Sequence, residues 1–440
     1  MKNKKWMAIL LGGIMAASLA APCSVSAAEK TTITFWHAMG GTNGEVLQQI
    51  VDDFNASQDE IEIKAEYQGT YDDTITKLKA AMQSDSGLPD VCQMYDVGTK
   101  FMYDSGAVIP VEDKFESTGY DKSSVMDVIS SYYTVEGKQY AMPFNVSTPM
   151  LYYNKDVFEA AGLDPETPPT TYDEVLEDAK KIVESGAAPV GYSQAVYGWF
   201  FEQQLAGLGV TYGNNDNGRT EAVTAVDFDS NGGGLKVFDM WKKLYDSGYF
   251  EDYGTTTADT QTAFFSGQVG MFIESTAILK NAVDSSPFEV GTGYLPRIEQ
   301  NDEGGVIIGG GSLWLTDTGN EANEDAAWKF IEYITTPDVQ AKWSMGTGYF
   351  AINEKAYETD DMKAYLKENP NFETAINQLK DSPVNCNTAG VLSGVQTEAR
   401  LTFNEIMPQV YDGKLTTQDA VDQLAASVNK AIENYNESIK

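Results

Sequence analysis

Along the first part of the chain, the spacing of hydrophobic residues alternates between the pattern of a strand and the pattern of a helix. Residues 31–36 (TTITFW) form a β-rich run, and apolar residues between 46 and 54 recur at helical spacing. Residues 61–67 alternate between apolar and polar, the apolar positions of 75–82 are again helical, and 90–95 is a short apolar run. This order of strand, helix, strand, helix and strand predicts a parallel sheet with crossover helices.

The pattern changes after the segment PFNVS at 143–147. A strand-like run at 150–153 leads into helices, and three prolines precede a helix that starts near Thr171. Further on we predict helices over 235–247, 324–334 and 421–432, and strands over 269–273 and 306–315. The chain therefore builds a second lobe and returns to the first sheet. Such a chain places a ligand in the cleft between the lobes, where hinge closure traps it.

The N-terminus has the pattern of an export signal. Three lysines precede a short apolar stretch from Trp6 to Ala21, and Val25-Ser26-Ala27 supplies the small residues of a cleavage site. We expect residues 1–27 to be a signal peptide cleaved after Ala27, which places the protein in a periplasm or at the cell surface. The alternative is a lipoprotein acylated at Cys23, which the preceding proline disfavours. No later stretch is apolar enough to span a bilayer.

Composition narrows the classes of function. The chain of 440 residues has 65 acidic and 30 basic residues, a formal charge of −35, and removal of the signal peptide with its three lysines would take it to −38. We expect no binding to nucleic acid, because no run of clustered lysine and arginine follows the N-terminus. With 42% hydrophobic residues the chain is globular, and its length predicts two or three domains.

Little in the sequence supports catalysis or a metal site. His37 is the single histidine, and Cys92 and Cys386 lie far apart, so we expect two separate thiols rather than a disulfide. The segment Asp227–Gly232 matches the front half of an EF-hand loop, but Phe238 stands where the bidentate glutamate is required. We therefore expect no metal and no cofactor. A secreted hydrolase of glycosides or phosphodiesters stays an alternative, and it would require a suitably spaced pair of carboxylates across the cleft or a bound metal.

Several sequence blocks together resemble the extracellular solute-binding proteins of ABC importers. They are Phe35-Trp36-His37, the block 143–172 (PFNVSTPMLYYNKDVFEAAGLDPETPPTTY), 307–315 (IIGGGSLWL) and Thr347-Gly348-Tyr349. The resemblance implies an α/β, two-lobed periplasmic-binding-protein-like fold of type II. Each lobe then has a mostly parallel sheet flanked by helices, and the chain crosses the hinge between the lobes several times. It places 28–143 plus about 308–335 in the first lobe and 144–307 plus about 336–440 in the second.

The resemblance also implies a function. Within the family the likeness is to members that bind glycerol 3-phosphate, which are not enzymes and hand their ligand to the membrane permease subunits of an ABC importer. We therefore expect a monomer that captures glycerol 3-phosphate or a glycerophosphodiester such as glycerophosphocholine. An oligosaccharide-binding protein of a sugar importer is the alternative.

Residues that match the family's ligand contacts follow from the same resemblance. The implied ligand-binding residues are Tyr71, Asp96, Ser147, Ser275, Gly310, Tyr349 and Arg400. Further candidates for the cleft are Trp36, His37, Tyr172 and Trp199. Hydroxyls, a glycine backbone and a guanidinium suit a phosphate, and Asp96 and Tyr71 suit the glycerol hydroxyls.

Three positions depart from the family pattern. Asp96 stands where glutamate is general, Tyr172 where tryptophan is common, and Glu274 where a small neutral residue is expected. A carboxylate aimed at a phosphate opposes binding, and strand alternation predicts that Glu274 points away from the side that Ser275 faces.

Overall fold

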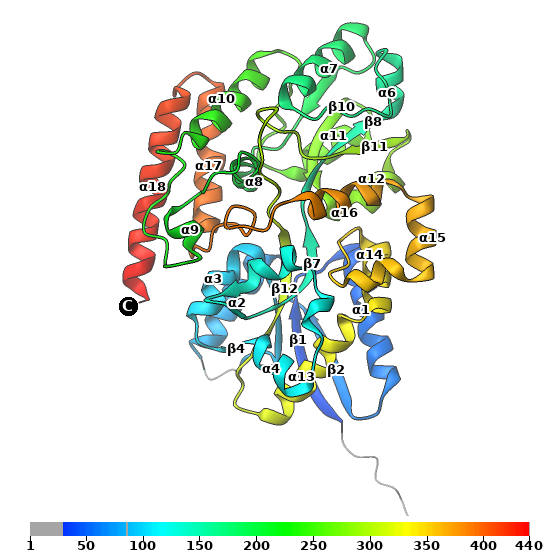
Figure 1. The fold of residues 1–440 in the computed structure, drawn as a ribbon, viewed down its shortest axis with the longest axis vertical. Helices are drawn as coiled ribbons and strands as arrows, with labels where there is room; N and C mark the ends of the chain where they lie inside the picture. The colour runs from blue at the N-terminus through cyan, green and yellow to red at the C-terminus, as the bar shows by residue number, and fades with distance from the viewer. Residues whose placement is uncertain (1–29, 85–86, 440) are drawn as a thin grey trace, which may run out of the picture.

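The computed structural model describes residues 30–84 and 87–439. In this part of the chain a 6-stranded and a 4-stranded sheet form separate lobes, and a two-stranded hairpin joins β5 (Thr134–Val135) to β6 (Lys138–Gln139). Figure 1 shows the lobe that holds β1 and β2 below the lobe that holds β8 and β10. The chain has the predicted two-lobed α/β architecture.

The first lobe opens with the predicted alternation of strands and helices. Its elements are β1 (Thr31–His37), α1 (Gly41–Ser57), β2 (Ile61–Tyr67), α2 (Tyr71–Met82) and β3 (Val91–Tyr95). The residues whose spacing predicts α1 are those it buries, including Leu47, Ile50 and Phe54. Thr70 and Asp73 form a capping box that fixes the start of α2 next to the cleft.

The first sheet is mixed rather than mostly parallel. Its order is β2-β1-β3-β12-β4, where β4 is Val108–Ile109 and β12 is Gly309–Thr316, and β7 (Met142–Ser147) also pairs with β12. β1 is parallel to β2 and β3, but β12 is antiparallel to β3, β4 and β7. The prediction of a mostly parallel sheet is wrong here, because β12 enters from the other lobe instead of through a helical crossover.

The second sheet has the order β11-β8-β10-β9, formed by β8 (Pro149–Asn154), β9 (Val190–Ser193), β10 (Val269–Ser275) and β11 (Val290–Gly293). Only β9 and β10 pair in parallel, so the prediction is also wrong for this lobe; β8 is antiparallel to both of its neighbours. Every residue of β8 is buried. Met150 and Tyr152 pack into one apolar cluster and Leu151 and Tyr153 into the other, because helices cover both faces.

The chain passes between the lobes at β7–β8, where Thr148 alone separates the strands, and again between β11 and β12. α13 (Glu321–Ile334) then packs on β1 and β12, and α14 (Pro337–Thr347) packs on α1. α16 (Asn371–Asp381) contacts β11 in the second lobe. A further passage therefore lies between α14 and α16, beyond the boundary near 335 that the sequence suggests.

The other helices surround these sheets. In the first lobe and along its edge they are α3 (Thr99–Asp104), α4 (Val111–Thr118), α5 (Asp127–Ser130) and α15 (Asp360–Glu368). In the second lobe they are α6 (Lys155–Ala160), α7 (Tyr172–Ser185), α8 (Gly198–Gly207), α9 (Asn214–Gly218), α10 (Gly233–Asp246), α11 (Thr257–Phe265), α12 (Leu279–Ser285), α17 (Gln396–Tyr411) and α18 (Thr417–Ser438). Figure 1 shows α17 and α18 side by side, with α18 reaching down toward the first lobe.

The predicted signal peptide, 1–27, lies outside the described residues and stays a prediction. None of the described helices is long and apolar enough to cross a membrane. Cys92 is buried, Cys386 is partly exposed, and both are free thiols.

Candidate functional site

A cavity of about 380 Å³ lies between the two lobes. The first lobe contributes residues from α2, β3, β7 and β12, and the second from α8, α11, β10 and α17. All seven predicted ligand-binding residues line it: Tyr71, Asp96, Ser147, Ser275, Gly310, Tyr349 and Arg400. Residues more than 300 positions apart in sequence thus meet at one place.

Strand and helix ends place these side chains. Ser147 ends β7, Asp96 directly follows β3, and Ser275 ends β10. Tyr71 is the first residue of α2, behind the capping box. Ends of elements face the space between lobes in open α/β folds, which brings polar groups into the cavity without interrupting the core.

A buried ion network holds Arg400. Its Nε and Nη2 donate hydrogen bonds to Glu202 Oε1 and Oε2 at 2.8 and 2.7 Å, and Nη2 also donates to Asp96 Oδ2 at 2.7 Å. The three side chains are only 7–8% exposed. Burial opposes the charged guanidinium, but the carboxylates of Asp96 and Glu202 raise the pKa of Arg400 well above its usual range. The Arg400–Asp96 pair joins the second lobe to the first.

The cavity also contains a second acidic group, Glu274. Its carboxylate accepts hydrogen bonds from Gln261 Nε2 at 3.0 Å and from the Ser275 N–H at 2.7 Å, and burial raises its pKa. The expectation that Glu274 points away from the cleft is wrong. Both residues line the cavity, because Glu274 lies at the end of β10 and its carboxylate turns back to the backbone N–H of Ser275.

Neutral donors and acceptors come from the first lobe. Asn145 Nδ2 donates to the Tyr71 hydroxyl at 2.7 Å, and Gln93 Nε2 donates to Asn145 Oδ1 at 2.6 Å. Burial raises the pKa of the Tyr71 and Tyr349 hydroxyls, so both stay protonated donors at neutral pH. With Ser147 and Ser275 they give the cavity uncharged hydroxyl groups for a polar ligand.

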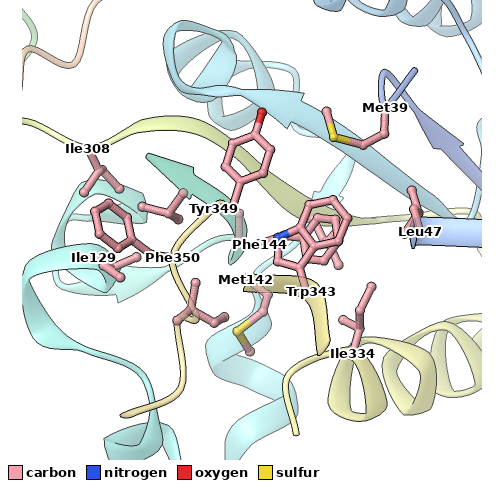
Figure 2. Packing of buried hydrophobic residues seen from close by; sticks show 14 of the residues in the cluster. Met39, Leu47, Ile129, Met142, Phe144, Ile308, Ile334, Trp343, Tyr349 and Phe350 are labelled. Atoms are coloured by element: carbon pink, nitrogen blue, oxygen red, sulfur yellow. The ribbon is translucent and has the colours of Figure 1, made fainter. Parts of the chain in front are cut away.

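Aromatic rings complete the lining. Tyr71 and Tyr95 stack with centroids 5.1 Å apart, and Tyr197 and Trp199 line the cavity from α8 and the residue before it. Tyr349 stacks on Trp343 at 5.6 Å, and Figure 2 shows its hydroxyl pointing out of the apolar cluster formed with Phe144. Flat rings with polar tips suit sugar faces and alkyl ammonium groups.

Only one of the other four candidate residues lines the cavity. Trp199 lines the cavity, whereas Trp36, His37 and Tyr172 do not. Trp36 Nε1 donates to Glu66 at 3.0 Å at the sheet edge, and His37 Nδ1 accepts from the Met39 N–H at 3.3 Å. Tyr172, the first residue of α7, accepts a hydrogen bond from Gln204 of α8.

Sequence reasoning missed Glu202 altogether. The signal was present, because α8 reads GWFFEQQLAG and a lone acid within so apolar a helix needs a buried partner. What the sequence does not show is that the partner is Arg400, almost 200 residues later. No group of three or more His, Cys, Asp or Glu residues that could hold a metal ion occurs in the described parts of the chain.

This fold and this cavity define a two-lobed binding protein for a small polar molecule. The model of the family described as bacterial extracellular solute-binding protein matches residues 49–374, and the chain belongs to that family. Proteins of this family capture small molecules for the permeases of ABC transporters and are not enzymes. The chain is thus a solute-binding component of an ABC importer.

The relatives bind different ligands. The chain is 31% identical to the sn-glycerol-3-phosphate-binding periplasmic protein UgpB of Escherichia coli K12, with 93% of this chain and 94% of UgpB covered. Its fold matches UgpB of Mycobacterium tuberculosis in complex with glycerophosphocholine with a TM-score of 0.79 at 21% identity, over 93% and 100% of the two chains. It also matches a cyclic α-maltosyl-1,6-maltose binding protein of Arthrobacter globiformis with a TM-score of 0.76 at 26% identity, over 92% and 100%.

Proposed function

We propose that this protein captures a glycerol phosphate ester in the interlobe cavity and delivers it to the permease of an ABC importer. The form that fits best is a glycerophosphodiester with a cationic head group, such as glycerophosphocholine. The bacterial relative that is 31% identical over nearly the whole length binds sn-glycerol 3-phosphate by name, which supports the glycerol phosphate part of the ligand.

The observation that carries this proposal is the composition of the cavity. A phosphate needs several compact donors, and Ser147, Ser275, Tyr349 and Arg400 all line the same space. The cavity also holds the carboxylates of Asp96 and Glu274, which oppose a second negative charge on the ligand. A phosphodiester has a single negative charge, and a quaternary ammonium group is attracted both by Glu274 and by the rings of Tyr197 or Trp199.

The test is calorimetry on the purified chain with glycerophosphocholine, glycerol 3-phosphate and maltose. We expect heat from the phosphate esters and none from maltose. Arg400→Ala should weaken binding by roughly 100-fold, about 3 kcal/mol, because it removes a charged donor and leaves Asp96 and Glu202 without their cation.

The matched control is Arg297→Ala, since Arg297 is exposed and does not line this cavity. It should leave the affinity unchanged. Arg400→Lys keeps a positive charge beside Asp96 and Glu202, so it should preserve the fold while it removes the guanidinium contact with the ligand. Circular dichroism checks that each variant is folded. If neither phosphate ester binds to the folded wild-type chain, the proposal is wrong. Recovery of unchanged glycerophosphocholine after incubation separates a carrier from a hydrolase.

A neutral oligosaccharide is the second candidate. The stacked Tyr71–Tyr95 pair and Trp199 offer faces for sugar rings, and the fold matches a binding protein for a cyclic maltose derivative. This candidate predicts heat with maltodextrins, and a loss of affinity in Trp199→Ala that exceeds the loss in Arg400→Ala.

A further inference from the structure

One helix of the second lobe places a charge directly behind the cavity. α8 contains a single acidic residue, Glu202, which is 7% exposed and does not itself line the cavity. Its carboxylate accepts hydrogen bonds from Arg400 Nε, from Arg400 Nη2 and, at 2.9 Å, from Gln396 Nε2. Glu202 is therefore held from two positions of α17.

Glu202 occupies the pair of N–H groups of Arg400 that would bind a phosphate best. A guanidinium usually grips an oxyanion through two parallel N–H groups, and here Nε and one hydrogen of Nη2 are already directed at Glu202. Asp96 accepts from Nη2 as well. Among the described residues Nη1 has no hydrogen-bond partner, so this amino group is what Arg400 retains for a ligand.

The local charge follows from the same contacts. One guanidinium faces the carboxylates of Glu202 and Asp96, and Glu274 lines the cavity nearby. A phosphomonoester has a charge of about −1.5 to −2 at neutral pH, whereas a phosphodiester has about −1. Because the groups are buried, the difference of about 0.5 to 1 charge between the two kinds of ligand is weakly screened and can decide between them.

We propose that Glu202 is the specificity-determining residue of this site, which rests on the proposed function: by occupying the guanidinium fork of Arg400 and cancelling its charge, it makes the cavity select glycerophosphodiesters over glycerol phosphomonoesters. Glu202 acts through Arg400 and is a positioning residue, since it does not reach the ligand space itself. Asp96 and Glu274 add to the same preference from inside the cavity.

The experiment measures the ratio of the affinities for two ligands, and a general loss of stability does not change this ratio. Calorimetry gives the dissociation constants of glycerol 3-phosphate and glycerophosphocholine for the wild type, for Glu202→Gln and for Glu405→Gln. Glu405 is exposed on α17, the helix of Arg400, so its substitution changes the net charge equally without touching the cavity. We expect Glu202→Gln to shift the ratio toward glycerol 3-phosphate by tenfold or more, and Glu405→Gln to leave it unchanged.

An unchanged ratio in a folded Glu202→Gln variant that binds both ligands overturns the inference. Failure of the wild type to bind either ester instead overturns the proposed function, so the two failures are distinguishable. If Glu202→Gln does not fold, the wild type is tested with glycerophosphomethanol, a monoanionic diester without a cationic head. It should bind at least tenfold more tightly than glycerol 3-phosphate, and equal or weaker binding overturns the inference.

Discussion

At the scale of single residues, burial decides which charged side chains interact strongly with one another. A surface ion pair such as Lys342 with Asp53, whose side chains are 40% and 57% exposed, contributes little to stability. Arg400, Asp96 and Glu202 are removed from water, where an unpaired member would be costly, so each depends on the others. The functional chemistry is concentrated in this group rather than in the abundant acids of the surface.

His37 provides a prediction at this scale. Burial lowers its pKa from 6.5 to about 4, so the folded state takes up its proton later than the unfolded state as the pH falls. Stability should therefore be fully present above pH 6.5 and decrease toward pH 4, by up to roughly 3 kcal/mol from this residue.

Because His37 is the single histidine, its imidazole NMR signal in an untagged protein reports this titration directly. His37→Gln should flatten the part of the pH–stability curve that the residue causes. A midpoint near 6.5 in the folded protein would contradict the prediction.

At the scale of elements, β12 is the part on which the cavity most depends. It enters the first sheet through three glycines, and Gly310 adopts φ +90°, which strains any other residue. A Cβ at Gly310 would lie 1.9 Å from the Asn145 carbonyl oxygen of β7, so the close pairing of the two strands requires glycine there. The same pairing brings Ser147 opposite Gly309 at the rim of the cavity.

Gly310→Ala tests this role. We expect it to destabilise the protein by about 2–4 kcal/mol through backbone strain and overlap with β7, and to reduce ligand affinity more than tenfold. Gly319→Ala is the matched control, because Gly319 has φ +69° but nothing within 4 Å of a new Cβ, and it should cost only about 1 kcal/mol. Urea denaturation measures both. Equal losses in the two variants would show that overlap with β7 does not matter.

At the scale of the whole molecule, polar contacts connect the lobes along one seam. Besides Arg400 and Asp96, Tyr95 bonds Thr397 at 2.8 Å, and Tyr435 of α18 donates to Asp104 of the first lobe at 2.6 Å. We expect hinge motion to break and re-form these bonds as the cleft opens and closes around a ligand. The formal charge of the whole chain, −35, acts at long range on every ion that approaches the cavity.

The net charge predicts different salt responses for two ligands. Association of glycerol 3-phosphate should accelerate as salt rises from roughly 20 to 200 mM, because screening weakens its repulsion by the acidic surface. Glycerophosphocholine has no net charge, so its association rate should change little over the same range. Stopped-flow measurement of intrinsic tryptophan fluorescence follows both rates. A marked slowing of glycerol 3-phosphate association by salt would contradict this electrostatic picture.

The sequence by itself determined the elements and the kind of protein. Periodicity located β1, α1, β2, α2 and β3 because each buries one face against its neighbours, and local spacing records that requirement. Motif blocks predicted the family and seven residues that the structure gathers into one cavity. Only the tertiary structure decided the rest: the antiparallel entry of β12, the inward position of Glu274 and the pairing of Glu202 with Arg400. The first and the last depend on contacts between segments far apart in sequence, and the second depends on how the Glu274 side chain turns back at the end of β10, which neither spacing nor alternation predicts.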